Sequence, residues 1–171
     1  ITATPTWTTN SHYALSAWYR YSGSTVDTSQ ALNSFSITTN TTGAAYTVKV
    51  PATDNWNVAA VFEKMYSLNV SMVYNGFASG YSNANVTITN GTFGTAKWYK
   101  ASETVSVNVP ANNIYVVNNL TGSATSNGTY SALTAGASNF VSLSGTTYTF
   151  DIAHATPYGS NDTYFVKVNF E

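Results

Sequence analysis

The ionisable side chains of this sequence are few and scattered. Glycoside hydrolysis needs two carboxylates about 5 to 10 Å apart, and the acidic residues are too widely spaced to nominate such a pair. The two histidines, His12 and His154, do not form a helical metal-binding pair. Nucleophile-elbow, phosphate-loop and dinucleotide fingerprints are absent from the sequence. We therefore expect no catalytic residues, no metal site, no cofactor and no enzymatic activity. The acidic residues are Asp27, Asp54, Glu63, Glu103, Asp151, Asp162 and Glu171.

A different chemistry is open to asparagine in the sequence Asn-x-Ser/Thr, which accepts N-linked glycans. The number of such sequons is only a mild excess over chance in a chain so rich in Ser, Thr and Asn. Asn69 and Asn85 alternate with apolar neighbours, so both are expected to point to solvent. We predict that several sequons carry covalent N-glycans. The candidate acceptors are Asn40, Asn69, Asn85, Asn90, Asn119, Asn127 and Asn161.

Composition excludes several classes of partner. The 171 residues are 43% hydrophobic but only 8% charged, with a net charge of -1 and no cysteine. A chain without a basic run is a poor nucleic-acid binder, and one without cysteine has no disulfides or thiolate sites. The apolar runs are too short to span a bilayer. A start at Ile1 is typical of a processed N-terminus, so an extracellular location is expected.

The elements that could position a functional surface begin with the first nine residues. Ile1, Ala3, Pro5 and Trp7 alternate with four threonines, which places the apolar residues on one face of a strand. Two interpretations follow from this pattern. The segment is either the first strand of its own β-domain, or a strand donated to the sheet of another molecule.

The rest of the chain reads as about ten to twelve short strands separated by turn signals, the pattern of an antiparallel sandwich. The exception is 53–67, where Val58, Val61, Phe62 and Met65 have helical spacing, so one short helix is predicted there. We predict an all-β chain with 1–10 as an N-terminal strand and 11–171 as a single sandwich domain.

Three further interpretations remain open. The aromatic residues could form a stacking platform of a secreted carbohydrate-binding module, although aromatics in sandwiches mostly fill the core. A virion or S-layer component would have the same strand count and composition. A lysine in a strand could also form an isopeptide crosslink with Asn or Asp. The tryptophans concerned are Trp7, Trp18, Trp56 and Trp98, and the lysines are Lys49, Lys97 and Lys167.

The alternating N-terminus, the cysteine-free composition rich in Thr, Ser and Asn, and the many sequons resemble the subunits of archaeal thread filaments of the Sulfolobales. The resemblance implies a fold similar to that of bacterial type 1 chaperone-usher pilins. In that fold an incomplete immunoglobulin-like sandwich is filled by the N-terminal strand of a neighbour. It further implies a glycosylated, extracellular, adhesive homopolymer of identical subunits.

On this resemblance the donor strand presents Ile1, Ala3, Pro5 and Trp7, and the C-terminal strand forms a wall of the acceptor groove. Pro5 departs from a regular donor strand because it has no amide hydrogen to contribute to a ladder. The implied acceptor residues are Tyr164, Val166, Val168 and Phe170.

Overall fold

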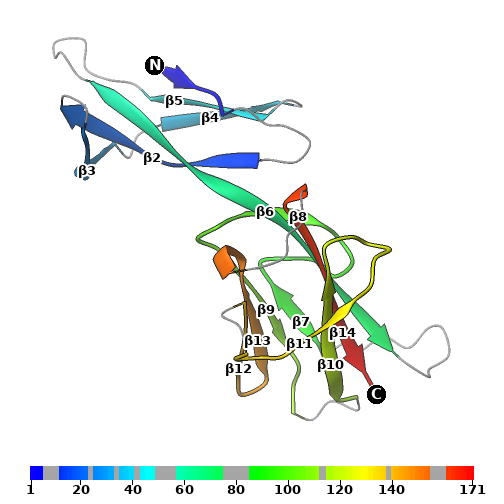
Figure 1. Ribbon diagram of the computed structural model, residues 1–171. Helices are drawn as coiled ribbons and strands as arrows, with labels where there is room; N and C mark the ends of the chain where they lie inside the picture. Colours follow the sequence, from blue (N-terminus) through cyan, green and yellow to red (C-terminus); the bar gives the residue numbers. More distant parts are fainter. Residues whose placement is uncertain are drawn as a thin grey trace. The chain divides into compact units, whose positions relative to one another are not determined.

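The computed structural model describes residues 1–5, 12–22, 25–32, 35–40, 43–48, 57–74, 85–111, 115–137, 140–154 and 161–171. Strands dominate these residues, joined by turns and by 3-10 segments such as η1 (Ile152–His154), so the predicted all-β fold is confirmed (Figure 1). The strands are β1 (Thr2–Ala3), β2 (His12–Ser22), β3 (Thr25–Leu32), β4 (Phe35–Asn40), β5 (Gly43–Val48), β6 (Val58–Tyr74), β7 (Thr87–Thr89), β8 (Lys97–Lys100), β9 (Thr104–Asn108), β10 (Val117–Ser123), β11 (Ser131–Leu133), β12 (Val141–Ser144), β13 (Thr147–Asp151) and β14 (Thr163–Phe170).

The chain forms two compact units, Ile1–Met65 and Tyr66–Glu171. The boundary lies inside β6, which therefore supplies its first half to unit 1 and its second half to unit 2. This division differs from the single sandwich that the sequence predicts over 11–171, because a continuous strand leaves no linker in the sequence to mark the boundary.

The helix predicted over 53–67 is wrong for the residues that the structure describes, since all positions from Val58 onward lie in β6. The first half of β6 pairs antiparallel with β2, from His12↔Met65 to Arg20↔Val58. Side chains from Val58 to Tyr66 are all half-buried, whichever way they point. A strand that is covered on both faces loses the period of two, and its ladder hydrogen bonds outweigh a weak helical preference.

Unit 1 contains two small sheets. One has the strand order β1-β5-β4, and the other joins β3, β2 and the first half of β6, with antiparallel pairing throughout. Its core draws side chains from both sheets, and the rings of Tyr46 and Phe62 meet edge to face at 5.9 Å. The buried core residues are Leu15, Trp18, Tyr46 and Val48, with Ala3, Leu32, Val58, Ala60 and Phe62 packed against them.

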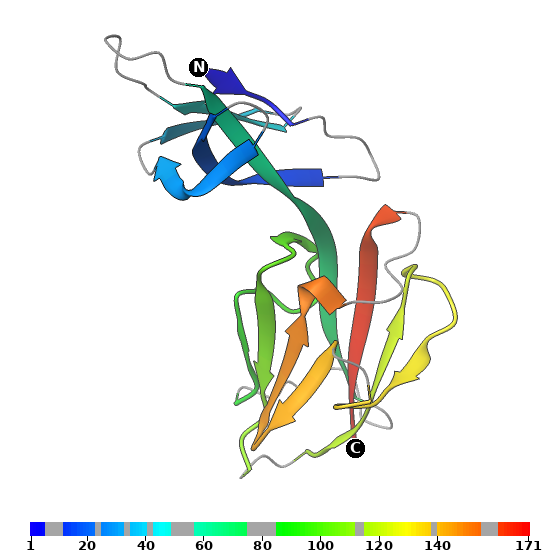
Figure 2. The same cartoon turned by 60° about the vertical axis from the view of Figure 1, so that its left-hand side comes forward.

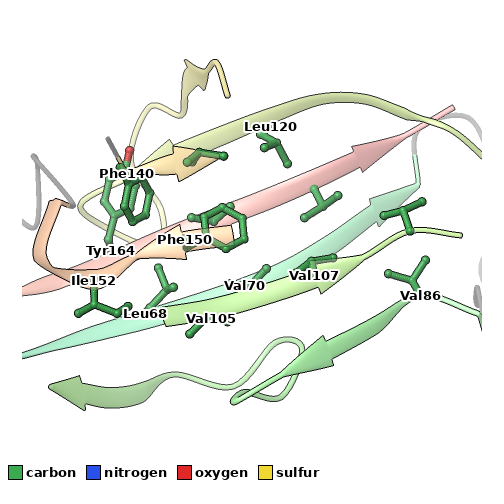
Figure 3. Close-up of a cluster of buried hydrophobic side chains, with 14 of the residues drawn as sticks. Leu68, Val70, Val86, Val105, Val107, Leu120, Phe140, Phe150, Ile152 and Tyr164 are labelled. Atoms are coloured by element: carbon green, nitrogen blue, oxygen red, sulfur yellow. The ribbon is translucent and has the colours of Figure 1, made fainter. Parts of the chain in front are cut away.

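Unit 2 is a larger sandwich (Figure 2). One sheet has the order β11-β10-β14-β6, with β8 also on β6, and the other has the order β12-β13-β9-β7. β10 pairs antiparallel with β11 and β14, and β12, β13, β9 and β7 pair antiparallel in their sheet, whereas β6 and β14 run parallel from Thr163↔Ser67 to Phe170↔Tyr74. Alternate residues of facing strands fill the core (Figure 3). Phe150 and Ile152, which alternate with polar or small residues in the sequence, are fully buried members of this core.

None of the described segments forms a helix long and apolar enough to span a bilayer. The Asn75-Gly76 pair that follows β6 in the sequence, a signal typical of a hairpin turn, lies outside the described residues.

Candidate functional site

The N-terminal strand adds to an edge of a unit 1 sheet. Thr2 and Ala3 of β1 pair antiparallel with Thr47 and Tyr46 of β5. The terminal amine of Ile1 donates to the Val48 carbonyl oxygen at 3.0 Å, and the Val48 amide donates back to the Ile1 carbonyl at 2.9 Å. The Thr2 and Thr47 hydroxyl oxygens lie 3.0 Å apart and share a hydrogen bond. Main-chain pairing therefore holds β1, as expected for an added strand.

The predicted alternation of this strand is visible in its burial. Thr2 and Thr4 are exposed, whereas Ala3 is half-buried against the unit 1 core and Pro5 is buried. Ile1, at the end of the strand, is 56% exposed. β1 ends at Ala3, so Pro5 is not required to donate a ladder hydrogen bond. Trp7 lies outside the described residues.

The residues implied as the acceptor wall lie in the core of unit 2. They occupy one face of β14, and none is more than 2% exposed. Both edges of β14 are paired within the chain, one with β10 and the other with β6. A strand docking beside β14 would have to displace one of these neighbours. These four residues are Tyr164, Val166, Val168 and Phe170.

The sequons differ in how their amides are held. The Nδ2 atom of Asn69 donates to the Gly94 carbonyl at 3.3 Å. In Asn90, which has a φ of 60°, Nδ2 donates to the Thr104 carbonyl at 3.0 Å and Oδ1 accepts from Lys97 Nζ at 3.1 Å. Asn85, Asn90, Asn119, Asn127 and Asn161 are exposed, Asn69 is half-buried, and Asn40 ends β4.

A hollow with a mixed polar and apolar lining, which the sequence does not reveal, lies on the side of unit 2 where edge strands β11 and β12 meet the solvent. It consists of two adjoining cavities of about 190 and 330 Å³ that share Val117, Leu143 and Tyr148. Leu143 is 49% exposed and Val116 is 58% exposed at its margin. The described residues that line it carry no charge. We call it the open-side hollow.

The other candidate residues do not converge. Trp18 is 1% exposed in the unit 1 core and Trp98 is half-buried, while Trp7, Trp56 and Lys49 lie outside the described residues. Exposed Lys97 contacts Asn90, and the ammonium of Lys167 lies 3.7 Å from the Tyr130 ring centroid. His154 pairs with Asp151 at 3.0 Å on the surface. Across the described ranges, His, Asp and Glu form no group of three that could hold a metal.

Stability is expected to fall in alkali and to change little in acid. Burial raises the pKa of the Tyr164 and Tyr130 phenols, and burial followed by the negative charge of Glu103 raises the pKa of Tyr99. The unfolded state releases these protons near the ordinary value of 10.0. The stabilisation is therefore complete below about pH 10 and is lost as the pH rises through the folded pKa values.

Thermal unfolding followed by circular dichroism across the pH range checks this expectation. Tyr99→Phe should reduce the alkaline loss. Between neutral pH and about pH 3 the midpoint should change little, because few carboxylates are available to take up protons; the chain has only seven. A collapse in acid would contradict this expectation.

No protein-family model matches the chain, and neither a curated protein nor a solved structure shows significant similarity to it.

Proposed function

We propose that this chain is the structural subunit of an extracellular, glycosylated cell-surface filament of the archaeal thread type. Its subunits polymerise head to tail by exchanging the N-terminal strand. The observation that carries the proposal is the position of β1 on the edge of β5, which we call the β1 site. There the terminal strand is held by main-chain hydrogen bonds, and the Ala3 side chain packs against the small core of unit 1.

The β1 strand of another subunit can occupy the same edge of β5. A β1 strand from a neighbouring subunit would make the same hydrogen bonds to β5. Strand exchange therefore loses none of the contacts between β1 and β5. When each subunit gives its β1 to one neighbour and receives the β1 of another at its own β5, the contact is heterologous and does not close on itself. Repetition of this contact produces a filament, and each donated strand covers an edge that would otherwise invite aggregation.

The location of the β1 site favours β5 over β14 as the acceptor. Among the described residues the N-terminal segment pairs with β5 over a short register, from Ile1–Val48 to Ala3↔Tyr46, so separating them requires few ladder bonds to break. Separating β14 from β6 would break a register of eight residue pairs. The strand that is easiest to release is the one that exchanges.

The surface chemistry is compatible with an adhesive role outside the cell. With 8% charged residues, the surface depends on hydroxyl and amide groups rather than ions. N-glycans on exposed sequons would add hydroxyl groups and shield the filament.

Crosslinking at one pair of threonines tests strand exchange. Thr2 and Thr47 are directly opposed, next to the doubly hydrogen-bonded pair of Ile1 and Val48. Thr2 and Thr47 are therefore a non-hydrogen-bonded pair of the antiparallel ladder. Pairs of that kind have Cα atoms about 4.5 Å apart, a spacing that a disulfide can bridge. Thr2→Cys and Thr47→Cys protein should be mixed before assembly and then oxidised, and we expect a disulfide-linked dimer in non-reducing electrophoresis. The chain has no cysteine of its own to compete.

Mixing Thr2→Cys with Thr129→Cys protein gives the matched control, because Thr129 is exposed in unit 2 and should form no specific crosslink. In a Thr2→Cys, Thr47→Cys double variant, exchange produces a ladder of linked subunits, and self-pairing produces only a monomer. A monomer from the double variant, together with no dimer from the mixture, would refute strand exchange.

A further inference from the structure

The sequon at Asn119 is held by a side chain from β14, a strand that is distant in the sequence but adjacent to β10 in the sheet. Asn169 on β14 is 8% exposed, and its Nδ2 atom donates to Asn119 Oδ1 at 2.8 Å and to Thr121 Oγ1 at 3.2 Å. The same Nδ2 atom lies 3.4 Å from the Asn119 carbonyl and 3.5 Å from the Lys167 carbonyl. Asn169 therefore contacts both polar members of the sequon Asn119-Leu120-Thr121.

This arrangement leaves the reactive atom of Asn119 accessible. The amide is anchored through its oxygen, and no acceptor among the described residues takes a hydrogen bond from its Nδ2 atom. In Asn69 and Asn90 the Nδ2 atom itself is bound to a main-chain carbonyl. A glycan on Asn119 is thus compatible with every hydrogen bond of that side chain, whereas in Asn69 and Asn90 one of the two Nδ2 hydrogens is already engaged, which restricts how that nitrogen can present the other.

Asn119 also lines the larger cavity of the open-side hollow. That cavity measures about 330 Å³, at the lower end of ligand-site volumes. Tyr148 offers an aromatic ring, and Asn118 and Thr134 offer polar groups at its border. A neutral sugar ring has an apolar C–H face and peripheral hydroxyl groups, so its chemistry matches this lining. A glycan attached at the border is present at high effective concentration.

We propose that Asn119 is glycosylated in the folded subunit and that its glycan covers the open-side hollow. This inference rests on the glycosylated character of the proposed filament. In the transfer step, Asn119 Nδ2 forms a bond to the anomeric carbon of a lipid-linked sugar phosphate and loses one proton. The bond from that carbon to the phosphate oxygen breaks, and the phosphate leaves with the electron pair. Asn169 acts as a positioning residue, and the glycan shields Leu143 from solvent.

Glycopeptide mass spectrometry of the full chain, secreted from a host that performs N-glycosylation, tests the site. We expect Asn119 to be occupied more fully than Asn69 and Asn90. Asn169→Ala should lower the occupancy of Asn119 by about fivefold, the change that one hydrogen bond of ordinary net strength supports. Occupancy at Asn127, which is exposed and receives none of the hydrogen bonds that Asn169 makes to Asn119, Thr121 and Lys167, provides a control within the same molecule and should not change.

A hydrophobic dye tests whether the glycan covers the hollow. Anilinonaphthalene sulfonate should bind the glycosylated protein weakly, and Asn119→Gln should increase its fluorescence, while Asn127→Gln should not. Tyr148→Ala in the glycosylated protein should also increase it, because the sugar loses its ring contact.

The outcomes separate the two proposals. An unmodified Asn119 beside a modified Asn127 overturns this inference and leaves the glycosylated filament standing. If Asn119 is glycosylated but dye binding is unchanged in Asn119→Gln, the glycan does not cover the open-side hollow. The absence of glycan from every sequon overturns both the inference and the glycosylated part of the proposed function.

Discussion

Replacing Ala3 with aspartate is expected to abolish filament formation, whereas the same substitution at Thr4 leaves filaments intact. Ala3 is half-buried and packs against the core that contains Leu15 and Trp18. A carboxylate placed there has to leave water without gaining a partner, which costs several kcal/mol even when the burial is partial. The short register that Ile1 to Ala3 make with β5 cannot offset that cost. Thr4 is exposed, so a carboxylate at that position remains hydrated.

Negative-stain electron microscopy and sedimentation of the two variants, prepared alongside the unmodified chain, measure this effect. Thermal unfolding of unit 2 serves as the folding control, since neither position belongs to that unit. Long filaments from Ala3→Asp protein would remove β1 from the contact between subunits. Loss of filaments in both variants would instead assign the effect to the added charge, whichever way the side chain points.

The strand periodicity of the sequence predicts local structure well. Alternation at the C-terminus places Tyr164, Val166, Val168 and Phe170 on one face, and the structure buries all four. The alternation of Ala3 and Pro5 with threonines likewise reappears as alternating burial. A period of two maps directly onto the two faces of a strand, so these assignments require no knowledge of the partner strand.

Features that depend on distant partners are not predictable in this way. Val58 to Met65 have helical spacing, but pairing of β6 with β2 decides their conformation. The parallel neighbour of β6 is β14, which follows it by about ninety residues and carries no sequence signal of that pairing. The contact of Asn169 with Asn119 joins positions 50 residues apart. The function of a side chain in such a contact depends on the register of strands that the sequence does not specify.

Gly122 illustrates the same limit and leads to the second large effect. It lies on β10 opposite Val166, and a Cβ atom at this position would lie 2.6 and 2.7 Å from Cζ and Cε1 of Tyr164 and still closer to its hydroxyl oxygen. Tyr164 is 2% exposed and its ring meets that of Phe140 edge to face at 5.6 Å, so it has little room to move. Both side chains belong to the core drawn in Figure 3. Nothing in the sequence around Gly122 indicates this contact.

Gly122→Ala is therefore expected to reduce the free energy of unfolding by about 2 to 3 kcal/mol, in the upper part of the range for overpacked cores. Urea unfolding of the variant measures it. Tyr164→Phe removes the hydroxyl oxygen, the atom nearest to the new methyl group, so the double variant should be more stable than the sum of the single changes predicts. A coupling of about 1 kcal/mol is expected for side chains in direct contact. Strict additivity would mean that the backbone of β10 moves instead, and that the Tyr164 ring does not limit the size of residue 122.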